Sequence, residues 1–220
     1  MSKHFERDLE NLQHRLLALS GMVEDLVVKA NQALTGRHAQ LAAQVVEADT
    51  EIDEQEVMIE DECLKMLALH QPVALDLRRI ATVMKVNNDL ERIADLAVNV
   101  AQRSESLQAC PEFVVPHKLE AMGHIATGMV RRALDALVAM DSAAAREVCA
   151  EDDKVDTLNR EIIDELLHVM QAQSWAVPAA LDCFSATRHL ERIADHATNI
   201  AEDVVYLVEG EIARHGRARR

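Results

Sequence analysis

Apolar residues recur at helical spacing through most of the chain. Plotted at about 100° per residue, the stretch between residues 80 and 101 places its apolar side chains in one broad arc. This arc consists of Ile80, Val83, Met84, Leu90, Ile93, Ala94, Ala97, Val98 and Ala101. Turn-forming residues interrupt such stretches only around positions 35–37, 70–72, 110–117, 140–142 and 174–178. The pattern therefore predicts an all-α chain of six helices, each roughly 25–35 residues long.

The chain also contains an internal duplication. The pentapeptide Glu-Arg-Ile-Ala-Asp occupies residues 91–95 and again 191–195, and neighbouring positions match at the same offset of 100. Upstream, residues 49–53 match residues 152–156. Matched motifs in matched order are typical of a structural repeat, and short connections favour antiparallel helices. We therefore predict a tandem repeat of two antiparallel three-helix bundles, over residues 1–109 and 118–213, with a linker at 110–117 and a basic tail at 214–220.

Composition and charge exclude several classes of protein. The chain carries 38 acidic and 23 basic side chains, a net charge of −15, which argues against nucleic acid or an anionic membrane as the main partner. A hydrophobic content of 49 % excludes a disordered chain. No apolar run approaches the roughly 20 residues that span a bilayer, and the first residues lack the apolar region of a signal peptide. With four separated cysteines and no CxxC pair, we expect a cytoplasmic protein with reduced thiols that does not span a membrane.

Acidic side chains occur within or beside the apolar arcs of four predicted helices. They are Asp49, Asp53, Glu56 and Glu60 in the second helix, Glu91 and Asp95 in the third, Asp152 and Asp156 in the fifth, and Glu191, Asp195 and Glu202 in the sixth. Asn99 and Asn199 extend the motif by one more step of four residues. Partly buried like charges repel one another unless something compensates them. A multivalent cation is one solution, and all-oxygen ligand sets suit Mg²⁺, Mn²⁺ or iron.

Ordinary ion pairs are the alternative to a metal. Arg92 and Arg192 lie within the repeated pentapeptide, but they directly follow the glutamates and should project about 100° away from them. Arg78, Arg79 and Arg188 could reach the acids from other positions. The spacing alone leaves both solutions open.

The second helix carries apolar residues on both flanks of its acidic stripe. Val45, Ile52 and Ile59 follow one flank, and Val46, Val57 and Leu64 follow the other. A three-helix bundle need not cover both flanks, and exposed apolar surface of that size usually marks an interface. We therefore expect a homodimer, with docking to another protein as the alternative.

The sequence offers no catalytic machinery. It has no GxSxG, Walker or HExxH motif, and no nucleophile with an adjacent base. An ExxH pair, of the kind that di-iron bundles use twice, occurs once at Glu165 and His168, whereas Lys65 takes the position of His168 in the first repeat. We therefore predict a protein that is not an enzyme.

Several motifs together resemble the PhoU family of phosphate-signalling proteins. They span Asp49–Asp53, Gln71–Arg78, Leu90–Asp95, His189–Asp203 and Tyr206–Gly210, in that order and in both repeats. The resemblance implies tandem three-helix bundles in a cytoplasmic, often dimeric protein. It also implies a regulator that restrains phosphate uptake and represses the phosphate-starvation response, acting with the phosphate ABC transporter and its sensor histidine kinase.

The resemblance further implies multinuclear metal sites with divalent or trivalent ions (iron, Zn, Mn or Mg). Position by position, the family's ligands map onto Asp49, Asp53, Glu91 and Asp95 in the first repeat and Asp152, Asp156, Glu191 and Asp195 in the second. Possible neighbours of the metal are Glu56, Glu60, Asn99, Asn199 and Glu202. A carboxylate-bridged metalloenzyme or iron carrier is the competing function, against which the missing second ExxH pair argues.

Overall fold

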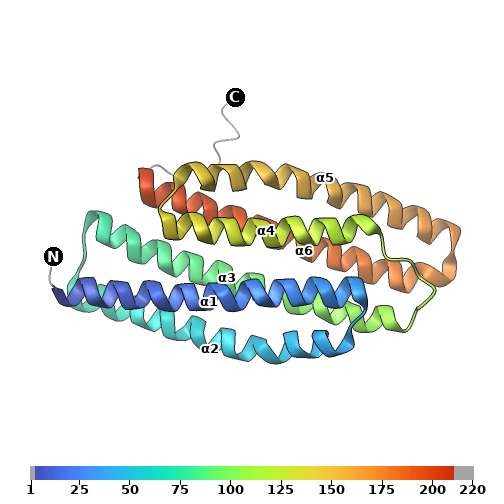
Figure 1. Cartoon of the computed structure of the whole chain (residues 1–220), viewed down its shortest axis with the longest axis horizontal. Coiled ribbons are helices and arrows are strands. Elements are labelled where there is room, and N and C mark those ends of the chain that lie inside the picture. Colours follow the sequence, from blue (N-terminus) through green and yellow to red (C-terminus); the bar gives the residue numbers. More distant parts are fainter. Residues whose placement is uncertain (1–2, 211–220) are drawn as a thin grey trace.

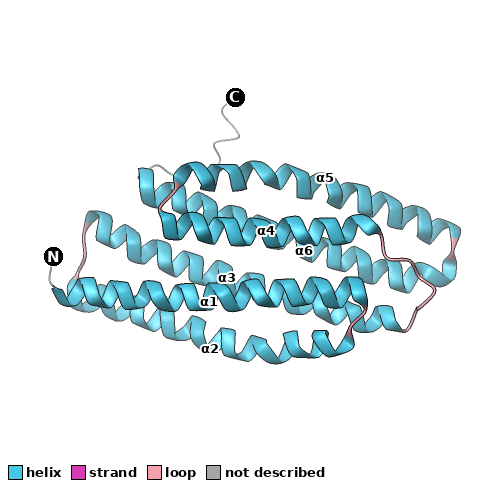
Figure 2. Cartoon of the chain, viewed as in Figure 1, coloured by secondary structure: helices cyan, strands magenta, loops and turns pink. Residues whose placement is uncertain are grey.

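The computed structural model describes residues 3–210, for Glu105 the backbone alone, and this part of the chain folds into six long α-helices without a strand (Figures 1 and 2). The helices are α1 (Lys3–Gly36), α2 (Ala39–His70), α3 (Ala74–Gln108), α4 (His117–Ala139), α5 (Ser142–Ala172) and α6 (Val177–Glu209). The predicted all-α class and number of helices are confirmed. Only α4, with 23 residues, is shorter than expected.

The helices end where the sequence carries turn and capping residues. Asp141 caps α5, because its Oδ1 accepts hydrogen bonds from the backbone N–H groups of Ala143 and Ala144 at 2.9 and 3.0 Å. A single 3₁₀ turn, η1 (Ser174–Ala176), separates α5 from α6. Gly210 then ends α6 in the left-handed region at φ 77°, a conformation that costs glycine little.

The two repeats form two bundles that lie side by side (Figure 1). Helices α1–α3 pack together in one bundle and α4–α6 in the other, while α3 contacts α6 and α1 contacts α4 across the junction. The predicted linker at 110–117 falls in the segment between the end of α3 at Gln108 and the start of α4, except that its last residue, His117, already belongs to α4. The predicted basic tail at 214–220 lies outside the described residues. Within residues 3–210, no helix is long and apolar enough to cross a membrane.

A continuous hydrophobic core runs through both bundles. Helices α3 and α6 contribute small side chains at matching positions, including Ala94 and Ala97 in one and Ala194 and Ala197 in the other, all at most 1 % exposed. These two central helices contact each other as well as the other helices of their own bundles. The acids of the pentapeptides therefore lie at the edge of a tightly packed core.

Candidate functional site

The antiparallel packing of α2 against α3 gathers the acids of the first repeat. Asn87 on α3 sets the register, since its Nδ2 donates to the backbone oxygen of Glu56 at 2.9 Å and to its Oε1 at 3.1 Å. One helical turn away from this contact, Asp53 on α2 lies near enough to Glu91 on α3 to repel its carboxylate. One turn beyond that pair, Asp95 repels the carboxylate of Asp49 in the same way. We call this group, Asp49, Asp53, Glu56, Glu91 and Asp95, the first acidic face.

Burial, together with repulsion between neighbouring acids, raises the pKa values of Asp49, Glu56 and Glu91 on the first acidic face. Burial is the largest cause of the raised pKa of Asp49, followed by repulsion from Asp53 and Asp95. Burial also dominates the raised pKa of Glu91, with Asp95 adding to it and Arg92 opposing it. In addition, Oδ1 of Asp49 is buried and has no hydrogen-bond partner. The face therefore holds more negative charge than its surroundings compensate.

Arg92 partly neutralises this face, which corrects the expectation that it projects away. Its Nε lies 3.2 Å from Oε2 of Glu91, and its Nη1 lies 3.2 Å from Oδ2 of Asp95. Spacing along the helix places only the Cβ atom, whereas the long arginine side chain folds back over its neighbours. Arg78 and Arg79 do not serve this face: Arg78 lies over the Tyr206 ring and Arg79 lies near Asp76.

The second acidic face consists of Asp152 and Asp156 on α5 with Glu191 and Asp195 on α6. Burial raises the pKa of Asp195, and repulsion from Asp156 raises it further. Burial likewise raises the pKa of Glu191, although Arg188 opposes the shift from 3.0 Å away. Asp152 is buried. The predicted pairing of acids across facing helices thus recurs in both repeats, and on each face an arginine forms an ion pair with the glutamate of the pentapeptide.

The predicted neighbours of the metal differ in where their side chains lie. Asn99 donates its Nδ2 to the backbone oxygen of Asp95 at 2.7 Å, and Asn199 approaches Asp89 of the other repeat at 3.4 Å. Glu60 is exposed, and Glu202 is half-buried. Of the five, Glu56 belongs to the first acidic face, where repulsion from Glu60 and Asp53 adds to the burial that raises its pKa.

The donor chemistry of the two faces fits a hard cation, but their side chains are spread along the helices. Carboxylate oxygens are the ligands that Mg²⁺, Mn²⁺ and ferric iron prefer, and the unpartnered Oδ1 of Asp49 is one such donor. Among the residues described, no three histidine, cysteine or acidic side chains lie close enough together to hold an ion. A metal would therefore have to draw the carboxylates inward and displace Arg92 and Arg188.

Sequence reasoning missed a set of polar contacts between the two repeats. Nζ of Lys85 lies 2.9 Å from Oδ1 of the buried Asp203, and Nη1 of Arg103 lies 3.6 Å from Oδ1 of Asp182. A third contact joins Asp89 to His196. These residues occupy positions at which the two repeats differ in sequence. A comparison of the repeats could therefore have identified them as candidates for contacts between the bundles.

The outer flank of α2 is exposed, as the sequence suggested. Val46, Val57 and Leu64 are 42 %, 60 % and 50 % exposed, whereas Val45, Ile52 and Ile59 on the opposite flank are buried in the core. One bundle thus covers only one side of the acidic stripe. The homodimer that this surface suggests stays a prediction.

The family model of the PhoU domain matches the chain twice, over residues 16–104 and 119–204. The phosphate-specific transport system accessory protein PhoU homolog of Pseudomonas aeruginosa is 40 % identical over 218 residues, which cover 98 % of this chain and 89 % of that protein. The corresponding PhoU protein of Escherichia coli is 32 % identical over 220 residues, with coverage of 98 % and 89 %.

Solved structures show the same architecture. The crystal structure of PhoU from Pseudomonas aeruginosa superposes with a TM-score of 0.89 at 40 % identity and covers 94 % of this chain and 100 % of its own. The phosphate transport system regulatory protein PhoU from Streptococcus pneumoniae superposes with a TM-score of 0.88 at 28 % identity, covering 95 % and 99 %. The likeness therefore extends through both repeats.

Proposed function

Because this chain belongs to the PhoU family, we propose that it is a regulatory accessory protein of a phosphate-specific transport system. In this role it restrains phosphate uptake and represses the phosphate-starvation response from the cytoplasm. The observation that carries the proposal is the match of both repeats, over nearly the full length, to proteins named for that accessory role.

We further propose that the protein works as an adaptor between the phosphate ABC transporter and its sensor histidine kinase. The contacts of α3 with α6 hold the bundles together, so the two acidic faces form two similar but distinct surfaces of one body. A divalent or trivalent metal at each face would neutralise the clustered carboxylates. The residues that would hold it are the eight acids named above, with Glu56 as a neighbour.

A binding role without turnover is part of this proposal. The relatives are named accessory and regulatory proteins, which fits a non-enzymatic function. The arrangement of similar carboxylates in two repeats supports two binding surfaces better than a single reaction site. The test is to add ferrous iron, and separately a phosphoester, to the purified protein. Turnover that Glu91→Ala/Asp95→Ala abolishes would overturn this part.

The adaptor function is tested in cells that carry acidic-face variants in place of the wild-type gene. We expect the quadruple variant Glu91→Ala/Asp95→Ala/Glu191→Ala/Asp195→Ala to derepress a phosphate-starvation reporter during growth in high phosphate. Asp25→Ala/Asp164→Ala removes two exposed acids outside both faces and serves as the matched control. Immunoblotting and circular dichroism establish that each variant accumulates and folds. Full repression in the quadruple variant at normal abundance would overturn the proposal.

We propose that the outer flank of α2 forms the interface of a homodimer. Val46, Val57 and Leu64 are exposed along one line of that helix, where they offer apolar area to a partner. Sedimentation at tens of micromolar should show a dimer for the wild type and a monomer for Val57→Asn/Leu64→Asn. A wild-type monomer would exclude the dimer and would favour docking of another protein on this flank.

A further inference from the structure

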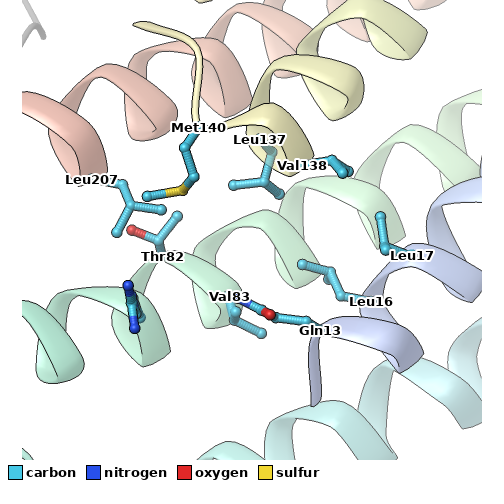
Figure 3. Close-up of a pocket in the computed structure, with 10 residues that line it drawn as sticks. Gln13, Leu16, Leu17, Thr82, Val83, Leu137, Val138, Met140 and Leu207 are labelled. Carbon is cyan, nitrogen blue, oxygen red and sulfur yellow. The ribbon is translucent and has the colours of Figure 1, made fainter. Parts of the chain in front are cut away.

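A cavity of about 170 Å³ lies at the junction of the two bundles (Figure 3), and no residue of either acidic face lines it. Helices α1 and α3 of the first repeat contribute part of its wall, and α4, the turn after it and α6 contribute the rest. Leu16, Val83, Leu137 and Leu207 make the lining mostly apolar. A concave apolar site with a few polar groups is the usual form of a small-molecule site.

Thr82 supplies a polar atom in this cavity that has no partner. Its side chain lies beneath Met140 and beside Leu207 in Figure 3, the residue is 1 % exposed, and its buried Oγ1 makes no hydrogen bond. A helical threonine usually donates to the carbonyl four residues earlier, as Thr127 and Thr187 do here at 2.8 Å. A buried hydroxyl without a partner is costly, so rotation of the Thr82 side chain toward an acceptor that a ligand brings into the cavity would be favourable.

Arg79 lies on the same face of α3 as Thr82 and Val83 and gives the cavity a positive charge. It precedes Thr82 by three residues and Val83 by four, and such residues are neighbours on a helix surface. Its acidic contact is Asp76, at 3.8 Å between Nη1 and Oδ1. At that length the pair leaves most of the guanidinium donors available.

We propose that this cavity binds a small amphipathic anion. Its carboxylate or phosphate group accepts hydrogen bonds from Arg79 and Thr82, and its apolar body packs against Leu16, Leu137 and Leu207. A cavity of this volume accommodates a body of about six to eight carbon atoms, because a cavity of about 150 Å³ accepts benzene. The site does not involve the acidic faces, so it stands apart from the proposed adaptor function.

The cavity is placed so that a bound ligand would affect how firmly the two bundles hold together. Its walls come from both bundles, so a bound ligand stabilises their junction by binding only the assembled form. Met140, at the rim, adopts the left-handed conformation at φ 53° although it is not glycine. Strained residues of this kind persist where the surrounding structure holds them and are common at ligand sites.

The proposal is tested with octanoate and octyl phosphate as carboxylate and phosphate probes, and with octanol as the uncharged analogue. Each is titrated into the full chain while the methyl resonances of Leu137 and Leu207 are followed by NMR. We expect saturable binding of at least one anionic probe, about tenfold tighter than that of octanol. No saturation by either anion up to about 10 mM, or equal binding of octanol, would overturn the proposal.

Variants assign the site to individual residues. Arg79→Gln should weaken binding of the anion about tenfold, and Thr82→Val should weaken it several-fold. Thr82→Val also removes the unpartnered hydroxyl, so we expect it to fold at least as stably as the wild type. Arg78→Gln is the matched control, because Arg78 lies over the Tyr206 ring and does not line the cavity. Equal weakening by Arg78→Gln and Arg79→Gln would overturn the assignment.

Discussion

Nδ1 of His196 on α6 lies 2.8 Å from Oδ1 of Asp89 on α3, so one side chain from each repeat meets at the junction of the bundles. Both side chains are largely buried, at 17 % and 9 % exposed. Asn199 approaches the same oxygen from 3.4 Å. This contact is inside the protein, so breaking it removes a buried polar interaction between the two repeats.

We predict that Asp89 and His196 are energetically coupled. Asp89→Ala and His196→Ala should each lower the free energy of unfolding by about 1–3 kcal/mol, because each removes a buried polar contact between the bundles. Asp89→Ala leaves the His196 side chain without this partner, whereas His196→Ala leaves Asp89 only the longer contact from Asn199. Urea unfolding of both single variants and the double variant at one pH measures the coupling, which we expect to exceed 0.5 kcal/mol, about the lower limit for residues in contact.

The pair formed by His70 and Asp8 provides the control for this cycle. Their side chains are 3.3 Å apart and more exposed, at 21 % and 31 %, so their coupling should be smaller. Equal couplings in the two pairs would contradict a special role for the junction.

The residues of the junction explain what comparing the repeats can and cannot predict. The pentapeptides match at an offset of 100, so each repeat independently predicts that their acids lie at the edge of the core. Arg103 and Asp203 occupy matching positions with opposite charges, and each contacts the other repeat. Positions at which the repeats differ thus supply these ion pairs between the bundles.

Two features could not be predicted from spacing. The path of the Arg92 side chain depends on rotamers, because its Cβ atom alone points away from Glu91. The apolar flanks of α2 are equivalent in sequence, and only the packing of α1 and α3 against this helix determines that Ile52 is buried while Val57 is exposed. Helical periodicity gives the faces of a helix but does not give the neighbour that covers each one.

We predict that Gly123→Ala destabilises the contact between α1 and α4. A Cβ atom at this position would lie 2.1 Å from Oδ1 and 2.4 Å from Cγ of the buried Asn31, which is too close for any real contact. Overpacking of this kind costs about 1–3 kcal/mol, measurable as a lower melting temperature. Asn31→Ala should restore most of the loss in the double variant, since it removes the clashing atoms. Gly21→Ala, with nothing within 4 Å of the added Cβ, is the control.

We predict that the metal-free protein gains stability from its first acidic face as the pH falls. The pKa values of Asp49 and Glu91 are raised in the folded state, so folding takes up protons there. Their stabilising contribution is lost as pH rises through the raised pKa values and is complete below the unfolded values of about 4. Asp8 and Glu209, whose pKa values are lowered, act in the opposite sense.

Comparison of variants isolates this contribution. Urea unfolding between pH 7 and pH 4, with chelator present, should show a flatter profile for Asp49→Asn than for the wild type. Asp25→Asn removes an exposed acid on α1, outside both acidic faces, and serves as the control. Parallel profiles for Asp49→Asn and the wild type would show that Asp49 titrates alike in the folded and unfolded chains.

We predict that Arg92 competes with a metal ion for Glu91 and Asp95. Arg92→Gln should tighten binding of Mn²⁺ or Mg²⁺ at the first acidic face by several-fold, since it removes an ion pair worth about 0.5–1 kcal/mol. Glu91→Ala/Asp95→Ala should abolish that site and leave the second intact. Elemental analysis measures how many metal ions each variant binds, and calorimetry measures their affinity. Arg146→Gln is the control, because the partner of Arg146 is Glu209. An unchanged number of bound ions in the double variant would show that other residues hold the metal. Weaker metal binding by Arg92→Gln would show that Arg92 supports the site and does not compete for it.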